Sequence, residues 1–92
     1  MDLDQIVKKK IDFATKQVGG ELVLVPIKDN VAEMNEMFTL NDVGTLIWEN
    51  LVDGCAIDTL SDSVVEAFEI DKETAIADVG EFLGQLEKMM NG

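Results

Sequence analysis

The sequence predicts a small α+β domain in which a three-stranded antiparallel sheet is followed by three helices. In the first part of the chain, two runs rich in β-branched and aromatic residues are separated by a Gly-Gly pair, as in a hairpin. From residue 40 onward the apolar residues instead recur at helical spacing. The chain has 92 residues, 47% of them hydrophobic and 28% charged, which is ordinary for one globular domain with a single core.

The hairpin is expected to occupy residues 11–18 and 21–27. Gly19 and Gly20 lie between these segments, and a two-residue glycine turn is typical of a β-hairpin. Pro26 has no N–H to donate to a neighbouring strand, so it should lie near a strand end or at a sheet edge.

The segments that flank the hairpin are less regular. Residues 1–10 combine a weak apolar spacing with three consecutive lysines, and they fit either a mobile arm or a short helix. After a polar turn, Met34, Met37 and Phe38 predict a third short strand over residues 34–39. The predicted sheet therefore ends just before residue 40.

Two helices should follow the sheet, and the second of them is expected to be short. Asn41 is a good N-cap for the first of them, and Gly54 follows its last apolar residue, where a C-terminal glycine is expected. Asp58 or Thr59 is expected to cap the second helix.

A longer third helix is predicted over residues 72–90. Asp71 is its expected cap, and Glu73 places negative charge in the first turn, where the helix dipole favours it. The apolar residues of this helix span an arc of about 140°, whereas a core-facing stripe needs about 100°. The extra width fits either a contact outside the domain or a helix that is buried on two sides. Gly80 and Gly84 likewise fit either close backbone approach or simple tolerance.

The net charge of −12 is unevenly distributed along the chain. Residues 1–28 hold five lysines and four acids, whereas residues 29–92 hold two lysines and fifteen acids. Such an acidic body repels phosphate backbones and lacks the term that supplies most nucleic-acid affinity. We therefore expect no nucleic-acid partner.

The residues needed for metal binding and catalysis are largely missing. Cys55 is the single cysteine and the chain has no histidine, so neither a disulfide nor a Cys/His metal site can form within it. The commonest general base and a glycine-rich phosphate loop are absent too. The sequence predicts a binding domain that is not an enzyme and uses no cofactor or metal.

Nothing in the sequence indicates a membrane partner. The longest apolar run, residues 22–27, is far shorter than a bilayer span, and the first residues are acidic where a signal peptide would be basic. We expect a cytoplasmic location.

The central segment, residues 40–54, contains a recognisable pattern. It reads Leu-Asn, a few small residues, Ile-Trp, a hydrophobic pair and Asp-Gly. This pattern resembles the PqqD-like family, named for a pyrroloquinoline-quinone biosynthesis protein. The resemblance covers about residues 11–90 and is densest over residues 40–86, where Asp78-Val79 and Phe82-Leu83 match further family positions.

This resemblance implies a winged-helix-like, peptide-binding domain over residues 11–92. Such a domain is a non-catalytic chaperone and recognition element that binds the leader of a ribosomally made precursor peptide. It presents the leader to a modifying enzyme, often a radical S-adenosylmethionine maturase. The leader adds as a strand beside the third strand and lies against the last helix. The chain is also compatible with a homodimer. Carried over by position, the implied peptide-binding residues are Met34, Met37, Phe38, Val79, Phe82, Leu83 and Leu86.

Each of these residues also fits an ordinary core, and burial statistics favour the core for Val79 and Leu86. Apolar leader residues are expected to enter a gap lined by Met37, Phe82 and Leu83. Trp48 lies just beyond the apolar stripe of the first helix and is interpreted as a packing residue.

Two other functions are compatible with the size of the chain. An acidic acyl or peptidyl carrier protein would need a serine in an Asp-Ser-Leu motif, and this chain has Asp58-Thr59-Leu60 instead. A winged-helix nucleic-acid binder would share the expected fold, but the acidic helices disfavour it.

Overall fold

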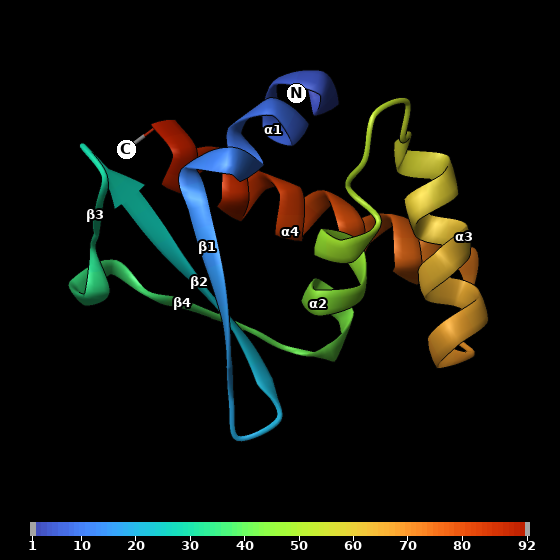
Figure 1. Cartoon of the computed structure of the whole chain (residues 1–92). Coiled ribbons are helices and arrows are strands. Elements are labelled where there is room, and N and C mark those ends of the chain that lie inside the picture. The colour runs from blue at the N-terminus through green and yellow to red at the C-terminus, as the bar shows by residue number, and fades with distance from the viewer. Residues whose placement is uncertain (1, 92) are drawn as a thin grey trace.

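The computed structural model describes residues 2–91, without the side chains of Met34 and Asn91. In this range the chain forms an antiparallel sheet of short strands followed by three helices, and one further helix precedes the sheet (Figure 1). The fold class predicted from the sequence is confirmed.

The sheet is built around its second strand. The long strand β2 pairs with β1 on one side and with β3 and β4 on the other. Gly19 and Gly20 form the turn between β1 and β2 with φ angles of 56° and 88°, which L side chains adopt only with strain. The described strands are β1 (Phe13–Val18), β2 (Glu21–Lys28), β3 (Val31–Ala32) and β4 (Phe38–Leu40).

The third strand predicted over residues 34–39 is wrong in its bounds. The chain first makes the short strand β3, then a 3-10 turn, η2 (Met34–Glu36), and only then enters β4. The N–H of Glu33 donates to the carbonyl oxygen of Pro26 at 2.8 Å, and the N–H of Glu36 donates to that of Glu33 at 3.0 Å. These bonds fold the backbone into a turn over the first residues of the predicted strand.

Four α-helices are present in the described part of the chain, and two of the predicted caps are confirmed. The side-chain oxygen of Asn41 accepts from the N–H of Gly44 at 2.7 Å, and that of Asp71 accepts from the N–H of Thr74 at 3.1 Å. These bonds satisfy backbone donors that the first turn of a helix leaves free. The helices are α1 (Leu3–Lys9), α2 (Asp42–Glu49), α3 (Ile57–Phe68) and α4 (Lys72–Asn91).

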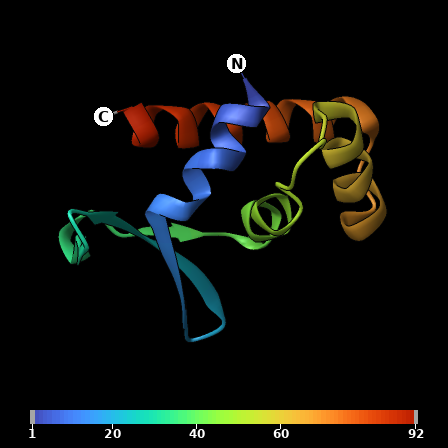
Figure 2. The same cartoon turned by 45° about the horizontal axis from the view of Figure 1, so that its top comes forward.

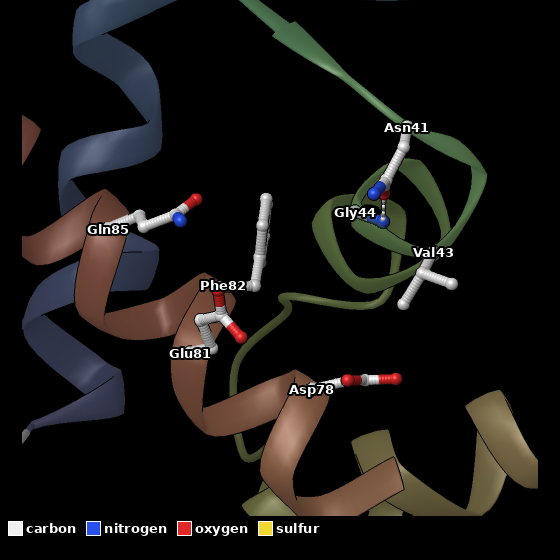
Figure 3. Close-up of a pocket in the computed structure, with 7 residues that line it drawn as sticks. All are labelled: Asn41, Val43, Gly44, Asp78, Glu81, Phe82 and Gln85. Carbon is white, nitrogen blue, oxygen red and sulfur yellow. Dashed lines mark hydrogen bonds between the residues drawn. The ribbon is translucent and has the colours of Figure 1, made fainter. Parts of the chain in front are cut away.

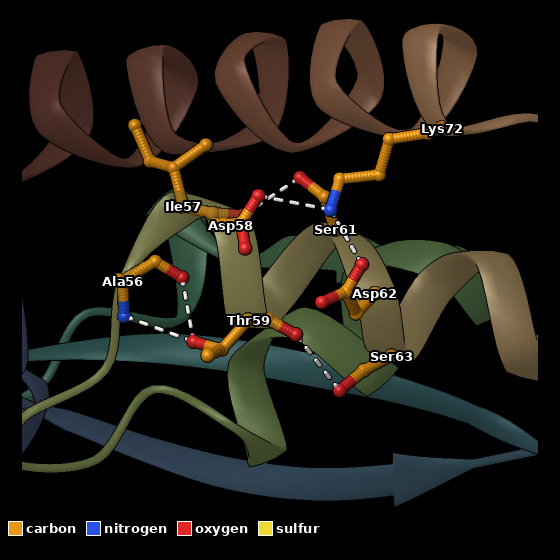
Figure 4. Close-up of polar contacts among 8 residues, drawn as sticks. All are labelled: Ala56, Ile57, Asp58, Thr59, Ser61, Asp62, Ser63 and Lys72. Carbon is orange, nitrogen blue, oxygen red and sulfur yellow. Dashed lines mark hydrogen bonds and ion pairs between the residues drawn. The ribbon is translucent and has the colours of Figure 1, made fainter.

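The other two helix boundaries differ from the prediction. Helix α2 ends at Glu49, so Gly54 belongs to the following turn, where it has a φ of 84°. Helix α3 begins before the predicted caps, with Ala56 as its N-cap. The Thr59 hydroxyl accepts from the Ala56 N–H at 3.1 Å and donates to the Ala56 carbonyl oxygen at 2.9 Å (Figure 4). Thr59 thus reaches back to the cap from inside the first turn.

Helix α4 is buried on two sides, which accounts for its wide apolar arc. Figure 2 shows α1 crossing α4, and the two helices are in contact. Ile6 of α1 is only 3% exposed and joins the core, while α3 packs along the other half of α4. Ile76 is the one clearly exposed member of the arc, at 44%. A methyl group added at Gly80 or Gly84 would meet open space, so neither glycine marks a close approach.

An ionic contact joins α3 to α4 at the surface. The Lys72 ammonium pairs with Asp58 at 2.9 Å and with Asp62 (Figure 4). Hydrogen bonds to Asp62 and then to Asp58 raise the pKa of Lys72. All three side chains remain well exposed, so the contact adds little to the stability of the fold.

Trp48 packs α2 against the start of the sheet. Its side chain is 5% exposed, and its ring meets that of Phe13 edge to face at a centroid distance of 6.0 Å. Within residues 2–91, no helix is long and apolar enough to cross a membrane.

Candidate functional site

The strand β4 has one unpaired edge among the described strands. It pairs with β2 through Leu40, Thr39 and Phe38, and no strand lies on its other side. Phe38 and Leu40 sit opposite Leu24 and Leu22 of β2, so all four side chains face the helices. The free backbone groups of such an edge are available to pair with another extended segment.

A hollow of about 210 Å³ opens where β4 ends. It lies between the beginning of α2 and the middle of α4, and the ring of Phe82 stands inside it (Figure 3). The residues that line it are Asn41, Val43, Gly44, Asp78, Glu81, Phe82 and Gln85. The free edge of β4 therefore leads directly into a concave surface with an aromatic floor.

Gly44 determines where the Phe82 ring can stand. A methyl group added at Gly44 would lie 3.0 Å from Cε1 of Phe82 and 3.3 Å from Oδ1 of Asn41. This approach is closer than ordinary van der Waals contact, so the absence of a side chain lets α2 and α4 come together here. Gly44 lies three residues after the Asn41 cap, and this local position alone does not indicate the close approach of α4.

The hollow is acidic. Asp78 and Glu81 lie three positions apart on α4 and border it, and no lysine is among its lining residues. Neither carboxylate makes an ion pair or a side-chain hydrogen bond with the described residues. No group of three or more His, Cys, Asp or Glu side chains that could hold a metal is found in the described part of the chain.

The structure separates the predicted site residues into two groups. Phe82 is 9% exposed and borders the hollow, Phe38 is half-buried on β4, and Met37 is 49% exposed just before this strand. The other helix residues in the prediction are fully buried core residues: Val79, Leu83 and Leu86. The side chain of Met34 lies outside the described residues.

The predicted gap is lined differently from what the sequence indicated. Of the three residues expected around it, Phe82 alone borders the hollow, because Leu83 faces the core and Met37 precedes β4. The polar residues that do line the hollow were not predicted. Asn41, Asp78, Glu81 and Gln85 reach it from two helices whose relative position sequence spacing does not give.

Comparison with known families gives a match over most of the chain. Residues 21–89 match the family model described as coenzyme PQQ synthesis protein D, PqqD. The chain belongs to the PqqD family. The matched range includes β4, α2 and α4, so the free edge and the hollow both lie within the part of the chain that defines membership.

One solved structure shares the fold. It is described as TbiB1 in complex with the TbiA(beta) leader peptide, and it superimposes with a TM-score of 0.67 at 23% sequence identity over 85% of each chain. A search of curated proteins finds no match to this chain.

Proposed function

We propose that this member of the PqqD family is a peptide chaperone. It binds the leader of a ribosomally made precursor peptide and presents it to a modifying enzyme of the radical S-adenosylmethionine class. The chaperone itself carries out no chemistry. The observation that carries this proposal is the unpaired edge of β4 that runs into the hollow around Phe82.

The two parts of this surface suit the two needs of peptide recognition. An open strand edge offers main-chain hydrogen bonds to any extended peptide, and an adjacent pocket distinguishes one side chain from another. A leader strand that pairs with β4 continues past Asn41 into the hollow between α2 and α4. The similarity in fold to a protein described in complex with a leader peptide supports the binding of a leader by this chain.

The proposed residues divide by role. Met37 and Phe38 border the leader at the strand edge, where methionine adapts to different neighbours. Phe82 is the anchor in the hollow. Val79, Leu83 and Leu86 are buried beneath it and hold α4 in place, so they act on the leader through the position of Phe82.

Titration calorimetry tests this function. The probe is a synthetic peptide copied from the leader of the short open reading frame next to this gene. Phe82→Ala should weaken binding by about 1 to 3 kcal/mol if the ring is an anchor. Met37→Pro should weaken it through the backbone, because proline removes an N–H from the strand edge. The φ of −61° at Met37 matches the angle that proline imposes.

Matched variants separate binding from folding. Phe68→Ala removes a half-buried aromatic ring from the end of α3, away from the hollow, and should leave affinity unchanged. Met37→Ala removes the side chain but keeps the N–H, so it should weaken binding less than Met37→Pro. Circular dichroism establishes that each variant is folded. Equal affinities for the wild type, Phe82→Ala and Met37→Pro would place the site elsewhere, and a folded wild type that binds no leader would remove the function.

A further inference from the structure

The two carboxylates at the hollow differ from the other acidic pair between α3 and α4. Asp58 and Asp62 share the ammonium of Lys72, a cation that the chain supplies itself. Asp78 and Glu81 have no such partner among the described residues. Their spacing of three places them side by side on α4, where like charges repel. A cation that enters the hollow relieves this repulsion.

The rest of the lining suits a long cationic side chain. The ring of Phe82 and the side chain of Val43 form apolar walls for an aliphatic stem. The face of an aromatic ring also attracts a cation. Gln85 contributes an amide at the rim, one helical turn beyond Glu81 on α4 (Figure 3). A volume of about 210 Å³ holds one such side chain.

We propose that the hollow between α2 and α4 receives an arginine or lysine side chain of the bound peptide. This inference rests on the proposed function and deepens it, because it names the leader chemistry that the site selects. Strand pairing along β4 brings the peptide to the hollow, and the carboxylates of Asp78 and Glu81 then select a basic residue there. Acidic residues outnumber lysines within residues 29–92, and this negative charge attracts basic peptides from a distance.

A selection from a displayed library of random 15-residue peptides tests this preference. Peptides are selected on wild-type protein and, separately, on the double variant Asp78→Asn/Glu81→Gln. Wild-type protein should enrich peptides with arginine or lysine at a fixed spacing from an apolar residue, and the double variant should lose this enrichment. A peptide selected on wild-type protein should bind the double variant about 2- to 30-fold more weakly, the range for two partly exposed charge pairs.

The matched control is Asp53→Asn/Glu66→Gln, which removes the same charge from exposed positions outside the hollow. It should keep the basic enrichment and lower affinity by less than about 2-fold, since distant charges are screened by salt. The reversed variant Asp78→Lys/Glu81→Lys should select acidic peptides in place of basic ones.

The outcomes separate this inference from the proposed function. Peptides that bind wild-type protein and lose affinity with Phe82→Ala, but show no basic enrichment, overturn the preference and leave the peptide site intact. If Asp78→Asn/Glu81→Gln still enriches peptides with arginine or lysine, the preference comes from the overall negative charge of the protein. This result overturns the role of the hollow. A library that yields no binder on folded protein overturns the peptide site and the preference together.

Discussion

The ammonium of Lys10 lies 4.8 Å from the centre of the Trp48 ring and 2.8 Å from the Trp48 carbonyl oxygen. The same nitrogen donates to the carbonyl oxygen of Leu51 at 2.9 Å. A helix leaves its last carbonyl groups without partners, and a cation near that end also complements the helix dipole. Lys10 therefore closes the C-terminal end of α2 from a position 38 residues before Trp48. Burial lowers the pKa of this lysine, and the charge of nearby Cys55 opposes the effect.

Replacement of Lys10 by methionine should destabilise the fold by about 1 to 3 kcal/mol. The variant keeps most of the apolar stem but loses two charge-assisted hydrogen bonds and the contact with the Trp48 ring. Urea unfolding monitored by circular dichroism measures the change. Lys8→Met is the control, because Lys8 is exposed in α1 just before Lys10, and its unfolding midpoint should stay within experimental error. An unchanged midpoint for Lys10→Met would contradict this role.

Trp48→Ala should cost about 2 to 5 kcal/mol in unfolding free energy, since it leaves a cavity between α2 and the start of β1. Ile47→Ala at the neighbouring buried position should cost a similar amount. Thermal unfolding measures both changes. Peptide affinity should change only indirectly, because Trp48 does not line the hollow. If Trp48→Ala kept the melting temperature and abolished peptide binding, the packing role of this residue would be wrong.

Local signals predicted the parts of the fold that depend on neighbouring residues. The glycine pair at 19 and 20 has the backbone angles of a tight hairpin turn, and Asn41 and Asp71 accept the hydrogen bonds expected of helix caps. Each of these features needs only a few consecutive residues. The third strand was placed less well, because the backbone bond from Glu33 to Pro26 that bends the chain is not visible in the apolar pattern.

Features that depend on distant residues were missed. Lys10 lies 38 positions before Trp48, so nothing in its local sequence indicates that it closes α2. The packing of α1 against α4 also joins segments that are far apart in the sequence. For that reason the sequence left two explanations for the wide apolar arc of α4. Of the residues that line the hollow, Phe82 was named from the family resemblance, whereas Gly44 and the acidic rim depend on how two helices approach each other.

The charge on Asp71 should make the start of α4 sensitive to acid. Hydrogen bonds from the side chain and then from the backbone of Thr74 lower the pKa of Asp71 below its ordinary value of 3.8. A carboxyl group whose pKa is lower in the folded state stabilises the fold fully above the unfolded value. This contribution is lost as the pH falls from 3.8 through the folded value.

The variant Asp71→Asn isolates this effect from the other carboxylates. Asparagine still caps a helix but does not titrate. Wild-type protein should be more stable than Asp71→Asn at pH 7, and the difference should shrink only below about pH 3.8. Urea unfolding of both proteins across this range measures the difference, and NMR titration of the Asp71 carboxyl carbon measures the pKa directly. A difference that stays unchanged as the pH falls below 3.8 would contradict the lowered pKa.

Alanine at Gly84 and alanine at Gly44 should have opposite consequences for stability and binding. A methyl group at Gly84 meets open space in the interior of α4, so Gly84→Ala should stabilise the protein by about 1 kcal/mol through helix propensity alone. At Gly44 the same methyl group lies 3.0 Å from the Phe82 ring, and the ring must shift by a few tenths of an ångström. The propensity gain is then offset, so Gly44→Ala should leave the melting temperature nearly unchanged while it narrows the hollow and weakens peptide binding. Thermal unfolding and calorimetry on both variants measure the two effects. If Gly44→Ala gained as much stability as Gly84→Ala and bound peptide normally, the close approach of α2 to Phe82 would have no part in the site.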